Sequence, residues 1–186
     1  MDYTLLLPLL LTVLVIAGIV FYNRIVKRRT LTEEAWAGVE ACLQQRNDLI
    51  PNLVETVKGY AGHEMTVLTE VVKWRNQSAA AASPGEQLTA QAGLSRALPG
   101  IFALSEQYPE LKADQNFSRL HSDLSDIEEK INHARRYYNG TVRDFNTAIV
   151  TFPGVVLATM LQIRRADFFE AEEGASAVPR VDFSSK

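Results

Sequence analysis

The chain has 186 residues, a formal net charge of −3 at pH 7 and one cysteine, Cys42. The slightly acidic balance gives no signature of nucleic-acid binding, and a single cysteine excludes an internal disulfide and a cysteine-based metal cluster. Beyond an apolar first segment about 160 residues remain, which is enough for one domain with a core of its own.

The first predicted element is an apolar helix from Tyr3 to Tyr22 that has no charged side chain. About 20 helical residues rise roughly 30 Å, which is the thickness of the hydrocarbon core of a bilayer. A cleaved signal peptide would need a basic start and small residues at a cleavage site, and both are missing. The segment therefore predicts an uncleaved single-pass membrane anchor. The side chains that represent this anchor are Tyr3, Leu10, Ile16, Phe21 and Tyr22.

A basic segment follows the anchor, whereas only Asp2 and the terminal amine precede it. Cytoplasmic flanks are enriched in Lys and Arg, so we expect the N-terminus outside and the rest of the chain in the cytoplasm. The cations are also placed to bind anionic lipid headgroups, at roughly 1 kcal/mol each; a stop-transfer flank without a further role is the simpler interpretation. These cations are Arg24, Lys27, Arg28 and Arg29.

A three–four spacing of apolar residues predicts one long helix over residues 31–82, with Pro51 bending it rather than ending it. The polar cluster Arg46, Asn47 and Asp48 lies beside this bend in an otherwise apolar stripe. Buried charges must be paired or hydrated. The cluster is interpreted either as a salt bridge at the surface or edge of the bundle, or as a register lock or partner contact.

Further helices are predicted over residues 86–108 and 117–152, and the latter carries an apolar seam opposite a charged face. No segment shows the alternation of a strand, so no sheet is expected. The predicted fold is all-α, with a single transmembrane helix followed by an elongated antiparallel bundle of long, coiled-coil-like helices. The predicted parts are an anchor with its basic flank over 1–29, a helical bundle over 30–170 and a flexible tail over 171–186.

Two aromatic–Asn pairs lie seven residues apart on the last long helix and so point the same way. Their rings are expected to fill the seam and their amides to cross-link helices, with ligand recognition as the alternative. The pairs are Tyr138-Asn139 and Phe145-Asn146.

The apolar run 155–163, followed by Arg164 and Arg165, is too short to cross a bilayer. Two interpretations stay open for this run. It belongs to the bundle core or a subunit contact, or it lies on lipid with the two arginines at the headgroups.

The sequence predicts no catalytic, cofactor-binding or metal site. His63-Glu64 begins like a zinc-protease motif, but the second histidine of that motif would stand where Val67 is. His121 and His133 are about 120° apart around a helix, which does not favour a shared metal. We therefore expect a protein that is not an enzyme and has no cofactor.

Two blocks of the sequence resemble the bacterial LemA family. The first is the segment from Arg46 to Tyr60, RNDLIPNLVETVKGY, followed by His63-Glu64. The second comprises Asn116-Phe117, Ala134-Arg135-Arg136-Tyr137-Tyr138-Asn139, Phe145-Asn146, Phe152-Pro153 and Phe168-Phe169-Glu170. One departure is Leu161-Gln162, where the family usually has Gly-Phe.

The resemblance implies a one-pass protein of the bacterial inner membrane, with a cytoplasmic helical bundle and no recognised catalytic residues. Some members are proposed as partners of HtpX-type membrane zinc metalloproteases, and a relative works in magnetosome membrane formation. An anchor with long apolar seams and no site indicates a self-associating scaffold that organises or shapes membrane, with lipid and further copies of the chain as partners. The alternative is an adaptor or substrate of such a metalloprotease in envelope quality control.

Overall fold

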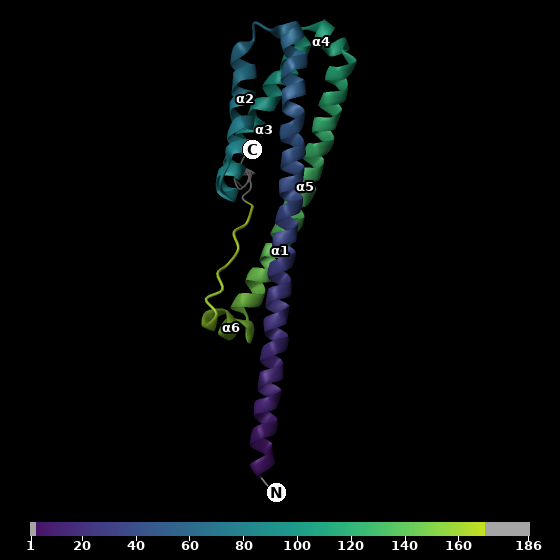
Figure 1. The fold of residues 1–186 in the computed structure, drawn as a ribbon. Helices are drawn as coiled ribbons and strands as arrows, with labels where there is room; N and C mark the ends of the chain where they lie inside the picture. Colours follow the sequence, from purple (N-terminus) through teal and green to yellow (C-terminus); the bar gives the residue numbers. More distant parts are fainter. Residues whose placement is uncertain (1–2, 170–186) are drawn as a thin grey trace, which may run out of the picture. The chain divides into compact units, whose positions relative to one another are not determined.

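A computed structural model describes the backbone of residues 3–169 and, except for those of residues 3–6 and Pro84, their side chains (Figure 1). The predicted tail over 171–186 lies outside the described residues. In the described part there is no strand, which confirms the all-α class. The helices are α1 (Tyr3–Ala61), α2 (Met65–Ala80), α3 (Pro84–Gln107), α4 (Pro109–Ala113), α5 (Gln115–Val150) and α6 (Gly154–Met160).

The chain forms two compact units, and each is described by itself. The anchor unit contains the part of the chain up to Asp48 together with Ser122–Phe168. The hairpin unit contains Leu49–His121 and the residues from Phe169 on. Both α1 and α5 contribute to both units, because each unit boundary falls within these helices.

In the anchor unit α1 and α5 run antiparallel, because residues with higher numbers on α1 contact residues with lower numbers on α5. Arg28 meets Asp144, the Trp36 ring lies 5.2 Å from that of Tyr138, and Arg46 meets Glu128. The residues between these contacts follow the predicted three–four spacing, as expected for a seam of two packed helices. Buried seam residues are Ile25, Ala35, Val39 and Leu43 on α1, and Leu124, Ile127, Ile131, Val142 and Phe145 on α5.

The prediction of one unbroken helix over 31–82 is wrong, because the structure divides this stretch between α1 and α2. Its first part is continuous with the anchor as α1, which runs through Pro51 without interruption and ends at Ala61. A turn at residues 62–64 separates it from α2. Gly62 begins this turn, and glycine is a poor helix former. The apolar spacing continues across the turn, so spacing alone did not reveal the break.

The hairpin unit contains an antiparallel pair, α2 and α3. The indole of Trp74 lies so close to the backbone of Gly93 that a Cβ there would overlap the ring. Nearby, the Gln91 Nε2 group donates to Ser78 Oγ at 2.6 Å in a buried position. The capping residue of α3 is Ser83, whose Oγ accepts from the backbone N–H of the third helical residue at 3.3 Å.

Asp114 connects the last part of α1 to the start of α5 within the hairpin unit. Its Oδ1 accepts from the Phe117 N–H at 2.9 Å, which caps α5, and its Oδ2 accepts from the Tyr60 hydroxyl at 2.8 Å. The hydrogen bond from the Phe117 N–H, and to a smaller extent the one from the Tyr60 hydroxyl, lower the pKa of Asp114 below its usual value. The same hydrogen bond, together with the charge of Asp114, raises the pKa of Tyr60.

The predicted helices over 86–108 and 117–152 correspond to α3 and α5. The prediction that the seam extends to Phe152 is wrong, because α5 ends at Val150 and the Phe152 side chain is 84% exposed. The chain turns there into α6, so the three–four spacing no longer describes one straight helix.

Candidate functional site

The apolar first part of α1 is exposed along its length. Leu10 is 58%, Ile16 55% and Tyr22 45% exposed, while Phe21 is half-buried. The side chain of Tyr3 is not among the described ones. A helix in a water-soluble core would bury such residues, since each large apolar side chain gains about 1.5–3 kcal/mol on leaving water. Among the described residues, α1 is the one helix long and apolar enough to cross a membrane.

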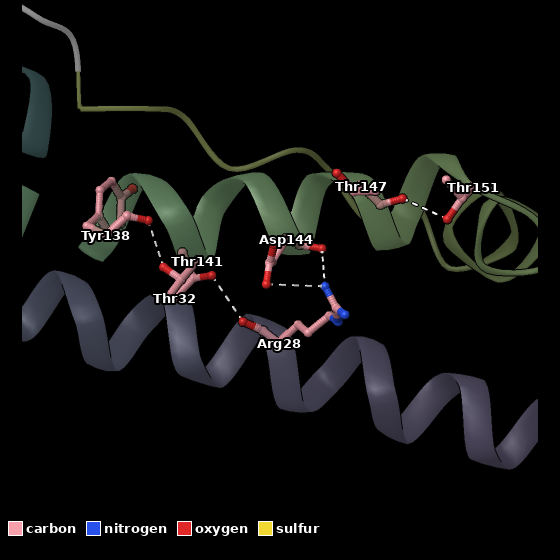
Figure 2. Close-up of polar contacts among 7 residues, drawn as sticks. All are labelled: Arg28, Thr32, Tyr138, Thr141, Asp144, Thr147 and Thr151. Carbon is pink, nitrogen blue, oxygen red and sulfur yellow. Dashed lines mark hydrogen bonds and ion pairs between the residues drawn. The ribbon is translucent and has the colours of Figure 1, made fainter. Parts of the chain in front are cut away.

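Just beyond the apolar part, Arg28 turns toward α5 (Figure 2). Its Nη1 donates to the carbonyl oxygen of Asp144 at 2.7 Å and lies 3.8 Å from the Asp144 carboxylate. Thr32 and Thr141 are buried beside this contact, and their hydroxyls donate to the carbonyls of Arg28 and Tyr138 in their own helices. The helices thus meet on small side chains whose polar groups are already satisfied.

The other three cations of the basic flank have different surroundings. Arg29 Nε donates to Glu33 Oε1 at 3.0 Å, one helical turn along. Arg24 and Lys27 are exposed, and neither has an ion-pair partner in the described part of the chain. Of the cations predicted to meet headgroups, these two have their charges most available for lipid.

The polar cluster beside Pro51 lies mostly inside the protein. Arg46 and Asn47 are each 2% exposed, and Arg46 Nη2 lies 3.4 Å from Glu128 Oε2 on α5. Asp48 is exposed and accepts from Gln44 Nε2 at 2.8 Å. The Arg46 guanidinium therefore lies within the seam and not on the surface. In this buried position its charge is stabilised by protein partners instead of water.

Tyr138 joins three segments of the anchor unit. Its ring packs on Trp36, and its hydroxyl donates to the Asp167 carbonyl oxygen at 2.9 Å. Burial, and to a smaller extent the nearby charge of Asp167, raise the pKa of Tyr138. One helical repeat later, Phe145 is buried beside Ile25. Both rings of the aromatic–Asn pairs thus lie in the seam.

Asn146 holds the segment that returns along α5 after α6. Its Nδ2 donates to the Ala166 carbonyl at 2.9 Å, and its Oδ1 accepts from the Ala166 N–H at 2.9 Å. The expected link between helices is therefore wrong for Asn146, whose amide binds non-helical backbone instead. Asn139 is half-buried on α5.

The short helix α6 lies against one end of the α1–α5 seam (Figure 1). A Cβ on Gly154 would overlap the carbonyl oxygen of Ala148, so glycine permits the close approach of α6 to α5. An open groove of about 390 Å³ lies between the end of α5, α6 and residues 162–165. The buried cluster at this contact is Ile25, Phe145, Ile149 and Ala158, with Leu157, Ile163 and Ala166 packed against it.

The histidines occupy separate places in the chain. His63 is exposed in the turn after α1. The ring of His121 stacks on that of Phe102, with 4.2 Å between the ring centroids. His133 Nε2 lies 3.8 Å from Glu129 Oε1, one helical turn away. Among the described residues, no three His, Cys, Asp or Glu side chains gather in a way that could hold a metal ion.

Comparison with known proteins identifies the family. The model of the LemA family matches residues 35–183. The chain belongs to the LemA family. The resemblance seen in the two sequence blocks is thereby confirmed, and the exposed apolar part of α1 fits a membrane-associated protein of this family.

Among curated proteins, the magnetosome protein MamQ of Magnetospirillum gryphiswaldense is 25% identical, over 92% of this chain and 75% of its own length. Magnetosome protein MamQ 1 of Paramagnetospirillum magneticum is 24% identical, over 85% of this chain and 67% of its own length. Protein LemA of Metamycoplasma hominis is 26% identical, over 86% of this chain and 72% of its own length.

In this LemA-family protein, the sequence did not single out several contact residues. Asp114, Asp144 and Asp167 were not identified, because a partner on another segment gives no local signal. For the run 155–163 the sequence left open whether it is buried or lies on lipid, because its spacing fits both interpretations. The structure shows Val156 and Met160 exposed, together with Phe152, which the spacing had placed in the seam.

Proposed function

We propose that this LemA-family protein is a non-enzymatic, single-pass scaffold of the bacterial inner membrane that self-associates and organises or shapes the bilayer. The observation that carries the proposal is the continuity of α1. One helix bears both the exposed apolar part and the buried seam from Ile25 to Leu43. The orientation of the apolar segment in the bilayer therefore sets the orientation of the α1–α5 seam, as a scaffold requires.

Self-association is supported by exposed aromatic surface on α5. Tyr137 is 56% exposed on a helix whose other exposed side chains are mostly polar or charged. Tyrosine is enriched in protein–protein interfaces, where its ring supplies contact area at low entropic cost. Confinement to a membrane raises the effective concentration of copies, so weak contacts suffice.

Light scattering on the full-length protein in a mild detergent tests self-association. We expect a molar mass of two or more protomers, shifted toward the monomer by Tyr137→Ala. Asn132→Ala, an exposed polar position on the same helix, serves as the control and should leave the mass unchanged. A monomer at every concentration would contradict the proposal.

The proposed topology has the N-terminus outside and the helical domain in the cytoplasm. The exposed cations Arg24 and Lys27 follow the apolar segment and support this orientation through the positive-inside rule. Reporter fusions at the C-terminus test it. A green fluorescent protein fusion should be fluorescent, and an alkaline phosphatase fusion should be inactive. The reverse pattern would refute the orientation.

The alternative role, as adaptor or substrate of a membrane zinc metalloprotease, remains a proposal of its own. Asp48 is the exposed member of the polar cluster and so is accessible to a partner, whereas Arg46 is buried. Loss of protease co-purification in Asp48→Ala, with the light-scattering mass unchanged, would favour the adaptor over the scaffold.

A further inference from the structure

The corner formed by the end of α5 and by α6 exposes a stripe of large apolar side chains. Phe152, Val156 and Met160 are 84%, 50% and 75% exposed. A spacing of four residues places Val156 and Met160 on one face of α6. Gly154 and Ala158 lie on the other face and are buried. The stripe thus faces away from the protein, and no described residue covers it.

The depth of this corner follows from its contact with α1. Ala158 packs in the cluster that contains Ile25, which is three residues beyond Tyr22, the end of the apolar segment. At 1.5 Å per residue, Ile25 lies about 4.5 Å past that end. The headgroup layer extends roughly 5–7 Å beyond the hydrocarbon core on each side. If α1 crosses the bilayer over its apolar segment, α6 lies at the depth of the headgroups.

The charges near the corner complement an anionic bilayer surface. Arg164 and Arg165 follow the stripe, are exposed and line the open groove beside α6. Neither has an ion-pair partner among the described residues. The exposed Arg24 and Lys27 lie on α1 within three residues of Ile25. An apolar face bordered by cations is the pattern of a helix that lies in the interface of a membrane.

We propose that the α5–α6 corner is a second membrane contact, in which Phe152, Val156 and Met160 insert at the headgroup–acyl boundary while Arg164 and Arg165 bind anionic headgroups. The inference rests on the proposed membrane anchorage by α1. The occupant is the bilayer itself, because the nearest apolar phase to this stripe is the one that α1 enters. Two contacts with one bilayer fix the tilt of the anchor unit, whereas a single helix leaves it free.

The experiment uses full-length protein in nanodiscs of phosphatidylcholine and phosphatidylglycerol, with Cys42→Ala as the background. An environment-sensitive fluorophore is attached to Val156→Cys or Met160→Cys. Ile16→Cys reports on the anchor, and Ser125→Cys, exposed on α5, serves as the aqueous control. Lipids that carry a nitroxide on the headgroup, on the upper acyl chain or on the lower acyl chain quench a probe at the corresponding depth, and the lower-chain lipid is the one that tests position 16.

We expect the probes at 156 and 160 to lose at least about half of their emission to headgroup or upper-chain nitroxides, as residues at the interface do. The probe at 125 should be unaffected. Replacing Arg164 and Arg165 by glutamine should reduce the quenching at 156, as should omission of phosphatidylglycerol.

Each other outcome overturns a specific claim. Quenching at 16 without quenching at 156 and 160 refutes the second contact and leaves the anchor intact. A blue-shifted probe at 156 that lipid nitroxides do not quench indicates coverage by another protein copy, which also refutes the lipid contact. Absence of quenching at 16 refutes membrane anchorage and with it the proposed function.

Discussion

The anchor unit and the hairpin unit bury their helices by different means. In the anchor unit two long helix segments meet along one seam, and polar side chains make specific links across it, such as Arg28 to Asp144 and Arg46 to Glu128. In the hairpin unit α2 and α3 approach until the Trp74 ring meets the backbone at Gly93. Two helices have too little surface to enclose a core, so the anchor unit also uses α6 and the segment up to Phe168.

This difference predicts that the two units respond to different substitutions. The chain contains two tryptophans, and the structure places Trp36 in the anchor unit and Trp74 in the hairpin unit. Labelling with fluorotryptophan therefore provides one fluorine resonance for each unit without any substitution. Denaturant titrations of the detergent-solubilised protein then report the free energy of unfolding of each unit separately.

The largest effect is expected for Gly154→Ala in the anchor unit. The new methyl group would overlap the carbonyl oxygen of Ala148, a backbone atom that has little room to move. Overpacking of this kind costs about 3 kcal/mol, at the upper end of its usual range. The Trp36 resonance should report this loss. Gly140→Ala, in the same helix as Ala148 and with open space around its Cβ position, should be neutral or stabilising.

Gly93→Ala should destabilise the hairpin unit by about 2 kcal/mol, because a methyl group there overlaps the rigid indole of Trp74. The Trp74 resonance should report the loss while that of Trp36 is unchanged. Gly59→Ala provides the matched control, since its Cβ position is open and alanine favours a helix by about 1 kcal/mol. If Gly93→Ala and Gly59→Ala had the same free energy of unfolding, the close packing of Trp74 on Gly93 would not stabilise the hairpin unit, and the proposed distinction between the two units would be contradicted.

Asn146→Ala should have a smaller, local effect in the anchor unit. Two hydrogen bonds to Ala166 are lost, each with a net worth of about 1 kcal/mol or less in a half-buried position. Hydrogen exchange of the Ala166 amide should accelerate, and Asn132→Ala should leave it unaltered. An unchanged exchange rate in Asn146→Ala would show that the returning segment does not depend on this amide.

The smallest effect is a pH dependence confined to the hairpin unit. The pKa of Asp114 is lowered in the folded state. Its contribution to stability is therefore present above the unfolded pKa, near pH 4, and is lost as the pH falls through the lower folded value. The free energy reported by Trp74 should decline below about pH 4 less steeply in Asp114→Asn than in the wild type. Identical slopes would contradict the assignment.

At alkaline pH the sign is opposite for the tyrosines. Asp114 raises the pKa of Tyr60, and burial raises that of Tyr138. The stability that each hydroxyl contributes is present below its unfolded pKa and lost as the pH rises through the folded value. Tyr60→Phe should remove this alkaline loss from the hairpin unit without affecting the Trp36 resonance.

Much of the fold could be predicted from periodicity, and the exceptions have definite causes. The seams through Leu43 and Ile131 are buried as their spacing predicts, and the helix passes Pro51 as expected. The break after Ala61 was not predicted, because apolar spacing continues on the far side of the turn. Phe152 fitted the seam pattern of α5, but the helix ends before it and its ring is exposed.

The sequence of this chain determined, without further information, its all-α class, the membrane-competent first helix and membership of the LemA family. These properties depend on composition, on periodicity and on residues in fixed order along one segment. Only the tertiary structure decided that Arg46 lies buried against Glu128, that Asn146 holds Ala166, and that the apolar face of α6 points outward. A helical period shows which residues share a face, but whether that face meets protein or solvent depends on segments distant in the chain.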